Sequence, residues 1–226
     1  MSREYCYRCR RPKVACLCPS SPPMETRTRI VLLMHTKEYR YQKTGTGRMA
    51  CLHLANSEII PGIALDGHPR VRELLDDPAN LPLLLYPGPG ATDLSGAPGS
   101  SGGPEVARLA ALAEGRRLVV FLVDSTWRCS HAVLRESPGI AALPRVQFRS
   151  SEKSRWIIKR QPRDYCLATI EAIHELLCAL ESAGLESYPD KTRLLEAFAA
   201  MQRYQIERTE IEKRPRRKDR NNIPRL

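Results

Sequence analysis

Three short, continuously apolar runs are the feature of this sequence that most constrains its fold. They are Ile30–Met34 (IVLLM), Leu81–Tyr86 (LPLLLY) and Leu118–Val123 (LVVFLV). None of them alternates apolar with polar residues, as a strand with one solvated face would, and their length favours strands that are buried on both sides. Such strands are typical of a mainly parallel sheet covered by helices on both faces.

The segments around these runs carry helical patterns and two weaker strand patterns. Apolar residues at helical spacing predict helices, and the following ranges show them: Met49–Ala55, Val71–Leu75, Pro104–Glu114, Thr126–Arg135, Asp164–Ala183 and Asp190–Gln205. Short strands are expected over Ser57–Ile60 and Val146–Phe148. The sequence therefore predicts an α/β fold, and ligands of such folds bind beyond the carboxyl ends of the strands.

Length and hydropathy predict one main domain with small additions. The chain has 226 residues, of which 42% are hydrophobic. We expect a cysteine-rich knuckle over residues 1–22, a catalytic domain over 23–205 and a basic tail over 206–226. No apolar run approaches the ~20 residues that span a bilayer, and the polar start lacks the apolar stretch of a signal peptide. These features predict a cytoplasmic protein without membrane association.

The charge of the chain predicts an anionic partner. The formal net charge is +11 and the isoelectric point is near 9.5. Nucleic acid is the commonest partner of such a surface, while an anionic membrane or simple solubility are the alternatives. The tail adds six basic residues and one acid over Lys213–Arg220. The sequence points to no protein partner.

Four of the eight cysteines lie within thirteen residues, as Cys6, Cys9, Cys16 and Cys18. In a reducing compartment such a cluster indicates a metal site more often than disulfides. Four thiolates favour tetrahedral zinc, and the absence of a neighbouring histidine indicates a structural site. Four incidental thiols are the alternative. The interleaved arginines and lysine would stabilise thiolates and could also contact phosphates.

Asp124 is the candidate functional carboxylate, because it follows the strongest apolar run directly and precedes Ser125, Thr126 and Trp127. A carboxylate at the end of a buried strand either caps the next helix or belongs to a ligand site. Trp127 could pack in the core or stack on a ligand. The residues alone leave both alternatives open.

These motifs together resemble the DTW-domain family of tRNA-uridine aminocarboxypropyltransferases, over roughly residues 6 to 180. The resemblance rests on the cysteine knuckle, the Asp-Ser-Thr-Trp tetrad and the following segments: Thr46–Arg48 closing a histidine-led stretch, Asn56–Glu58, Trp156–Pro162 and Thr169–Glu171. The chain departs from the family at Ala168, where a serine is usual. Ala168 cannot cap a helix through its side chain, so Thr169 or Asp164 is expected to do so.

The resemblance implies a SPOUT-like fold with a C-terminal trefoil knot that holds S-adenosylmethionine. It implies transfer of the 3-amino-3-carboxypropyl group to N3 of a tRNA uridine, with release of methylthioadenosine. Asp124 is the expected base, or a carboxylate that attracts the sulfonium. The cofactor is expected to contact Leu85, Tyr86, Pro87, Gly88, Asp124, Ser125, Thr126, Trp127, Thr169 and Glu171. The tRNA phosphates are expected at Arg48, Lys153, Arg155, Lys159 and Arg160.

Two other functions fit the same sequence less completely. One is a SPOUT-like RNA methyltransferase, which would release S-adenosylhomocysteine instead of methylthioadenosine. The other is a zinc-ribbon protein that binds RNA without catalysing a reaction. The product of the reaction and the need for a cofactor separate these alternatives.

Overall fold

The structure is a computed structural model that describes residues 4–9, 11–41, 45–95, 103–150, 152–159 and 166–213, without the side chains of residues 127–128 and 211–213. Arg160 and the basic tail from residue 214 onward lie outside the described residues. None of the described helices is both long and apolar enough to cross a membrane.

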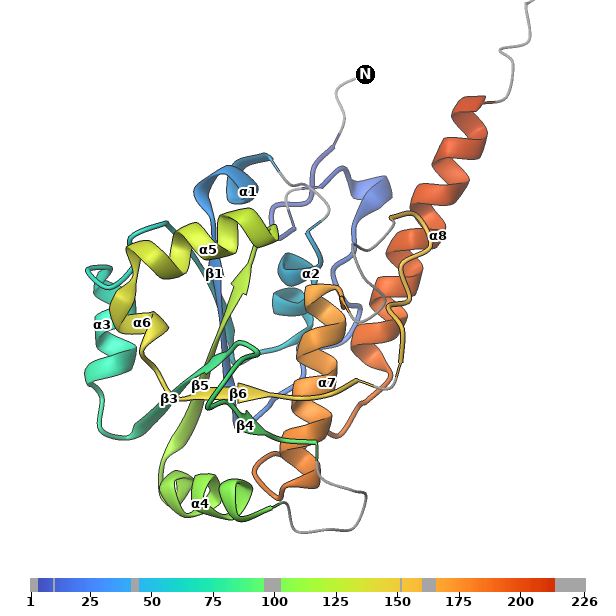
Figure 1. The fold of residues 1–226 in the computed structure, drawn as a ribbon. Coiled ribbons are helices and arrows are strands. Elements are labelled where there is room, and N and C mark those ends of the chain that lie inside the picture. Colours follow the sequence, from blue (N-terminus) through green and yellow to red (C-terminus); the bar gives the residue numbers. More distant parts are fainter. Residues whose placement is uncertain are drawn as a thin grey trace, which may run out of the picture.

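A six-stranded sheet forms the centre of the molecule (Figure 1). Its order is β2-β1-β5-β3-β6-β4, and every neighbouring pair is parallel. The strands are β1 (Arg29–Met34), β2 (Ser57–Pro61), β3 (Asn80–Leu85), β4 (Thr92–Asp93), β5 (Arg117–Asp124) and β6 (Arg145–Gln147). The three apolar runs form the adjacent strands β1, β5 and β3, which confirms the prediction of buried parallel strands.

Helices cover both faces of the sheet. One face packs against α3 (Pro69–Asp76), α5 (Trp127–Glu136) and α6 (Pro138–Ala141), and the other against α2 (Thr46–His53), α4 (Pro104–Ala113), α7 (Thr169–Ser182) and α8 (Arg193–Lys213). In β5, Val119 and Phe121 point to the first layer, whereas Val120 and Leu122 point to the second. This alternation explains why the strand is apolar at every position from Leu118 to Val123.

Helices α1 (Thr36–Tyr41) and α6 were not predicted, and α7 and α8 differ most from their predicted ranges. The short helix α1 has no buried residue, so it offers no apolar periodicity to detect. Helix α7 begins at Thr169 instead of residue 164, because the Glu171 carboxylate accepts the Ala168 N–H and fixes the first turn there. Helix α8 begins at Arg193 and continues to Lys213, past the predicted end at residue 205, and extends beyond the rest of the fold (Figure 1).

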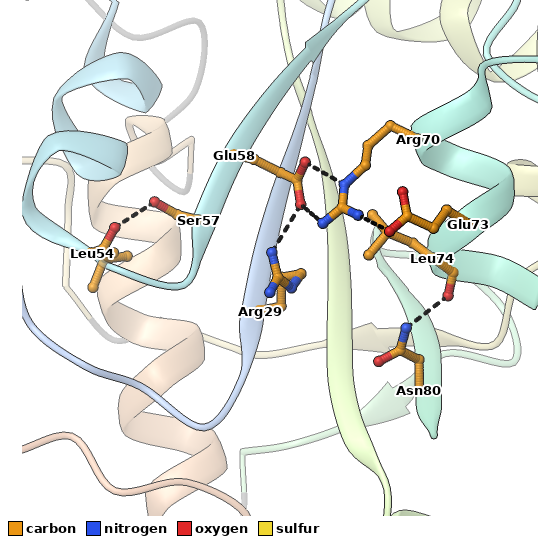
Figure 2. Close-up of polar contacts among 8 residues, drawn as sticks. All are labelled: Arg29, Leu54, Ser57, Glu58, Arg70, Glu73, Leu74 and Asn80. Carbon is orange, nitrogen blue, oxygen red and sulfur yellow. Dashed lines mark hydrogen bonds and ion pairs between the residues drawn. The ribbon is translucent and has the colours of Figure 1, made fainter. Parts of the chain in front are cut away.

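An ion-pair cluster fastens the edge strand β2 (Figure 2). Glu58 accepts two hydrogen bonds from Arg70 of α3, each 2.9 Å long, and one of 3.1 Å from Arg29 of β1. Burial alone would raise the pKa of Glu58, but the hydrogen bonds and charges of the two arginines outweigh burial and lower it. Glu58 therefore joins three elements at one edge of the sheet.

We expect Glu58→Gln to lower the free energy of unfolding by about 1–3 kcal/mol, between the effects typical of exposed and buried ion pairs. Because the pKa of Glu58 is lowered on folding, its contribution is present above the unfolded pKa near 4.5 and is lost as the pH falls through the folded pKa. Urea unfolding at pH 7 and pH 3 measures both effects. Glu73→Gln is the control, since Glu73 also pairs with Arg70 but is 67% exposed; an equal loss in the two variants would contradict this prediction.

Candidate functional site at the carboxyl edge of the sheet

A cavity of about 680 Å³ lies where the central strands end. Its walls come from the ends of β3 (Leu85–Pro87), β5 (Asp124–Thr126) and β6 (Gln147–Ser150), and from the start of α7. The parallel arrangement brings these strand ends together at one edge. The volume is within the range typical of small-molecule sites. The cavity therefore lies at the edge where ligands of parallel α/β folds bind.

Asp124 forms a buried part of the cavity wall. Its Oδ1 accepts a 2.6 Å hydrogen bond from the Thr169 hydroxyl, and its Oδ2 has no hydrogen-bond partner among the described residues. Burial raises the pKa of Asp124, and the bond from Thr169 opposes that effect without cancelling it. Asp124 is therefore a carboxylate that is held in place, weakly solvated and more basic than usual. Among the hydrogen bonds of the described residues, none joins its carboxylate to the turn that follows, as a helix cap would.

The first turn of α2 covers the second oxygen of Asp124. A Cβ atom built on Gly47 would lie 2.1 Å from Oδ2 of Asp124 and 2.8 Å from a methyl group of Leu32. Only glycine permits this close approach. The amino-terminal end of α2 also favours a negative charge at this place. The Thr-Gly-Arg segment, which sequence analysis connected with RNA through Arg48, therefore supports Asp124 through its glycine.

Helix α1 closes the cavity from the side of β1. Glu38 of α1 lines the cavity, and its carboxylate accepts the Thr126 backbone N–H at 2.9 Å. Thr126 precedes the first turn of α5 and makes no cap with its own side chain, so Glu38 caps that helix from another element. Sequence analysis missed Glu38, because a single acid in a polar segment carries no local signal of such a contact.

Most of the residues predicted to hold a cofactor line the cavity. They are Leu85, Tyr86, Pro87, Asp124, Ser125, Thr126 and Thr169. Gly88 follows in the left-handed region at φ 149°, and its N–H donates to the Gln147 side chain at 3.3 Å. The side chain of Trp127 lies outside the described part. Gln147, Phe148 and Ala172 also line the cavity; they were not predicted as site residues, because they come close to the others only through the fold.

Glu171 is buried behind the cavity wall and supports it. Its carboxylate accepts hydrogen bonds from the Ala168 N–H, the Ser154 hydroxyl and the Arg155 N–H, at 2.6 to 2.7 Å. These bonds fasten the segment after β6 to the start of α7. Thr169 or Asp164 was expected to cap this helix; the Thr169 hydroxyl donates to Asp124 instead, and Asp164 lies outside the described residues.

The predicted RNA-binding residues divide into two groups. Arg48 donates to the Tyr39 carbonyl, and its guanidinium lies 4.3 Å from the Tyr39 ring centroid, so it joins α2 to α1. Lys153, Arg155 and Lys159 are exposed in the segment before α7. Lys159 lines the cavity and lies 5.2 Å from the ring of Trp156, a further lining residue. A basic, aromatic rim therefore borders the cavity on this side.

The four clustered cysteines form a site that could hold a metal ion. Their sulfur atoms all lie within 4.8 Å of one another, and the pairs Cys6–Cys18 and Cys9–Cys16 are 3.7 Å apart. A tetrahedral centre with Zn–S bonds of ~2.3 Å has sulfur atoms about 3.8 Å apart. The backbone N–H groups of Cys9 and Arg8 lower the pKa of Cys6 to about 6, whereas burial and neighbouring thiols raise that of Cys18. The spacing of the four sulfur atoms therefore suits a tetrahedral metal ion.

The fold and the two sites define a class of protein: a parallel α/β protein with a cavity at the carboxyl edge of its sheet and a separate four-cysteine cluster that could hold a metal ion. The chain belongs to the DTW domain family, whose sequence profile matches residues 3–206.

Several curated proteins are also similar to this chain in sequence. A tRNA-uridine aminocarboxypropyltransferase 2 of Drosophila melanogaster is 28% identical over 93% of this chain and 78% of the relative. The protein of the same name from Mus musculus is 26% identical over 79% of this chain, which spans 57% of the mouse protein. A tRNA-uridine aminocarboxypropyltransferase A of Arabidopsis thaliana is 26% identical over 90% and 81% of the two chains. No solved structure matches the chain significantly.

Proposed function

We propose that this protein transfers the 3-amino-3-carboxypropyl group of S-adenosylmethionine to N3 of a tRNA uridine and releases methylthioadenosine. Membership of the DTW domain family and the shared name of the curated relatives support this function. The observation that carries it is the buried Asp124–Thr169 pair in a cavity of sufficient size for a nucleoside cofactor.

The donors around the cavity fit the proposed cofactor. A sulfonium is attracted by the buried carboxylate of Asp124. Leu85, Tyr86 and Pro87 offer apolar surface for an adenosine, and the turn at Gly88 lets backbone groups approach a ligand closely. When bound, S-adenosylmethionine supplies an electrophilic carbon and a thioether leaving group. Since its sulfur carries three such carbons, the positioning walls of the cavity decide which group is transferred.

The protein's own contribution to the reaction is to remove the N3 proton and to hold the uracil. Uridine N3 is a weak acid with a pKa of roughly 9, comparable to that of a thiol or a phenol. Asp124 accepts this proton as the new bond forms, and the Thr169 hydroxyl holds Oδ1 in place. The raised pKa of Asp124 makes it a stronger base than an exposed carboxylate. Trp127 and Trp156 are candidates for stacking on the uracil or adenine ring.

We infer a SPOUT-like fold with a C-terminal trefoil knot. The supporting observation is that the chain from β6 to α7 surrounds the cavity, since Gln147–Ser150, Trp156, Lys159 and Cys166–Thr169 all line it. The same segment carries Lys153, Arg155, Lys159 and Arg160, which we assign to tRNA phosphates together with Arg48. In this arrangement the elements that hold the cofactor also present the RNA.

We infer that the four-cysteine site holds structural zinc. Cys9→Ser should reduce bound zinc from about one atom per chain to nearly none and lower the melting temperature, because three thiolates and a hydroxyl bind zinc poorly. Metal analysis of the purified protein measures the first effect and circular dichroism the second. The matched control is Cys178→Ser, which changes a thiol of α7 outside the cluster and should leave the zinc content at one. Full zinc in Cys9→Ser would contradict the assignment.

The proposed function is tested by incubating the protein with unmodified bulk tRNA and S-adenosylmethionine. Nucleoside mass spectrometry should detect aminocarboxypropyl-uridine, and chromatography an equal amount of methylthioadenosine. Methylated uridine with S-adenosylhomocysteine would replace this function by methyl transfer. Binding of tRNA without any product would leave a protein that only binds RNA.

A further inference from the structure

The outward face of the cysteine knuckle carries exposed apolar side chains, and we call Tyr5, Tyr7 and Val14 the knuckle face. Their exposed fractions are 54%, 99% and 72%. Large apolar side chains normally gain free energy by packing, and single exposed ones need no explanation. Three exposed apolar side chains within ten residues of one small unit go beyond a single exposed residue, and groups of exposed apolar side chains mark interaction sites.

The local backbone turns these side chains away from the protein. Tyr5 pairs with Pro12 in an antiparallel bridge, and the Cys6 N–H donates to the Arg11 carbonyl at 2.7 Å. Tyr5 lies in this bridge and Tyr7 begins the turn that follows, and both rings are exposed, whereas Cys6 between them is half-buried and its sulfur belongs to the cluster. The bridge and the hydrogen bond hold the backbone of this segment, so a ligand would have to order the side chains but not the chain that carries them.

The charges around the knuckle face fit a polyanion. Arg8, Arg11 and Lys13 are interleaved with its residues, and the one acid described nearby, Glu4, pairs with Lys13 at 2.9 Å. Flat aromatic rings beside cations are the surface that unpaired nucleic-acid bases and their phosphates recognise. A stable protein interface would need a larger area than a single knuckle provides.

The knuckle face lies within reach of an RNA that enters the cavity. Arg8 donates to the Leu52 carbonyl at 3.4 Å, and the Leu17 carbonyl lies 3.3 Å from the His53 Nε2, so the knuckle sits on the last turn of α2. The first turn of α2 contributes Thr46 to the cavity wall. Eight helical residues span about 12 Å. One RNA molecule can therefore contact both places.

We propose that the knuckle face is a stacking platform for unpaired bases of the RNA substrate, outside the catalytic cavity. The inference rests on the proposed function in taking tRNA as the ligand. It gives the metal-binding unit a role in substrate binding, with Tyr7 as the principal contact and Tyr5 beside it. Arg11 contributes to the adjoining phosphate.

The experiment measures the dissociation constant of the full chain for tRNA by fluorescence anisotropy over a series of salt concentrations. We expect Tyr5→Ala/Tyr7→Ala to weaken binding about 5- to 100-fold, as the loss of base stacking does elsewhere, without changing the salt dependence. Arg11→Ala should instead make the slope of log K against log salt about 0.7 to 0.9 less steep. Tyr7→Trp should retain the affinity, because the indole ring also stacks.

Two controls keep the result specific. The double variant should retain its zinc and its affinity for S-adenosylmethionine, which excludes an unfolded knuckle. Leu112→Ala removes a 50% exposed side chain from α4 and should bind tRNA like the wild type. A double variant that binds tRNA with wild-type affinity would overturn the proposal that the knuckle face stacks on RNA bases. If that variant had lost the binding of a protein partner, the knuckle face would be a protein-binding surface. Failure of the wild-type protein to modify a tRNA that it binds would overturn the proposed function alone.

Discussion

Asp124→Asn is expected to reduce the rate of uridine modification by about 10²- to 10⁴-fold at saturating S-adenosylmethionine and tRNA. The amide has nearly the shape of the carboxylate but cannot accept the N3 proton, and general base catalysis is typically worth this factor. Single-turnover measurements of product by mass spectrometry give the rate of the chemical step. Asp77→Asn is the control, because Asp77 is exposed in the turn after α3 and should leave the rate unchanged.

The pH dependence of stability and of the wild-type rate separates the role of Asp124 in catalysis from its effect on folding. Burial raises the pKa of Asp124, so its contribution to stability is present in full below the unfolded pKa near 3.8 and is lost as the pH rises through the folded pKa. At neutral pH the buried charge of Asp124 therefore opposes folding. The melting temperature of Asp124→Asn should lie at most a few degrees below that of the wild type. The wild-type rate should rise with pH along a limb whose midpoint lies above 3.8. A wild-type rate in Asp124→Asn would remove this residue from the mechanism.

Gly47→Ala is expected to have the second large effect. The added methyl group would lie 2.1 Å from Oδ2 of Asp124 and 2.8 Å from Leu32, so either the carboxylate or α2 must move. Overpacking of this kind costs about 1–3 kcal/mol of stability. A displacement of about 1 Å at a reacting group can lower the rate about 100-fold. We expect both losses, measured by urea unfolding and by single-turnover kinetics.

Gly67→Ala is the matched control for this prediction. Gly67 has no atom within 4 Å of the position of a Cβ, and its backbone is not in the left-handed region, so the same substitution should be nearly neutral there. If Gly47→Ala retained the wild-type rate and stability, the close packing of α2 on Asp124 would not matter for function.

Much of the sheet could be predicted from local sequence, because its signal is local. The run Leu118–Val123 is apolar at every position since both faces of β5 are covered, and this pattern is visible without any knowledge of the neighbours. The four cysteines were predicted to form one site for the same reason: their spacing alone brings the thiols together. Asp124 stood out because a charge directly after a buried strand is unusual.

The contacts that define the site could not be predicted in this way. Thr169 meets Asp124 across 45 residues, and Glu38 meets Thr126 across 88, so both pairs depend on the order of the strands. Arg48 was assigned to RNA from its charge, whereas its stacking on Tyr39 depends on how α1 folds back on α2. Glu171 was grouped with the cofactor residues because it shares their motif. Its three hydrogen bonds to the chain itself become visible only when the segment before α7 is in place.

The seating of the knuckle on α2 has a consequence for anyone who shortens this protein. Arg8 and Leu17 contact the last turn of α2, as described above. In addition, the Met24 N–H donates to the His53 carbonyl, and the Ala55 N–H donates to the Met24 carbonyl. These bonds attach the amino-terminal segment to the end of α2. A truncated chain starting after residue 24 would lose all of these bonds, uncover the buried ring of His53 and loosen the helix whose other end holds Gly47 against Asp124. We therefore expect no minimal catalytic fragment without its first twenty residues.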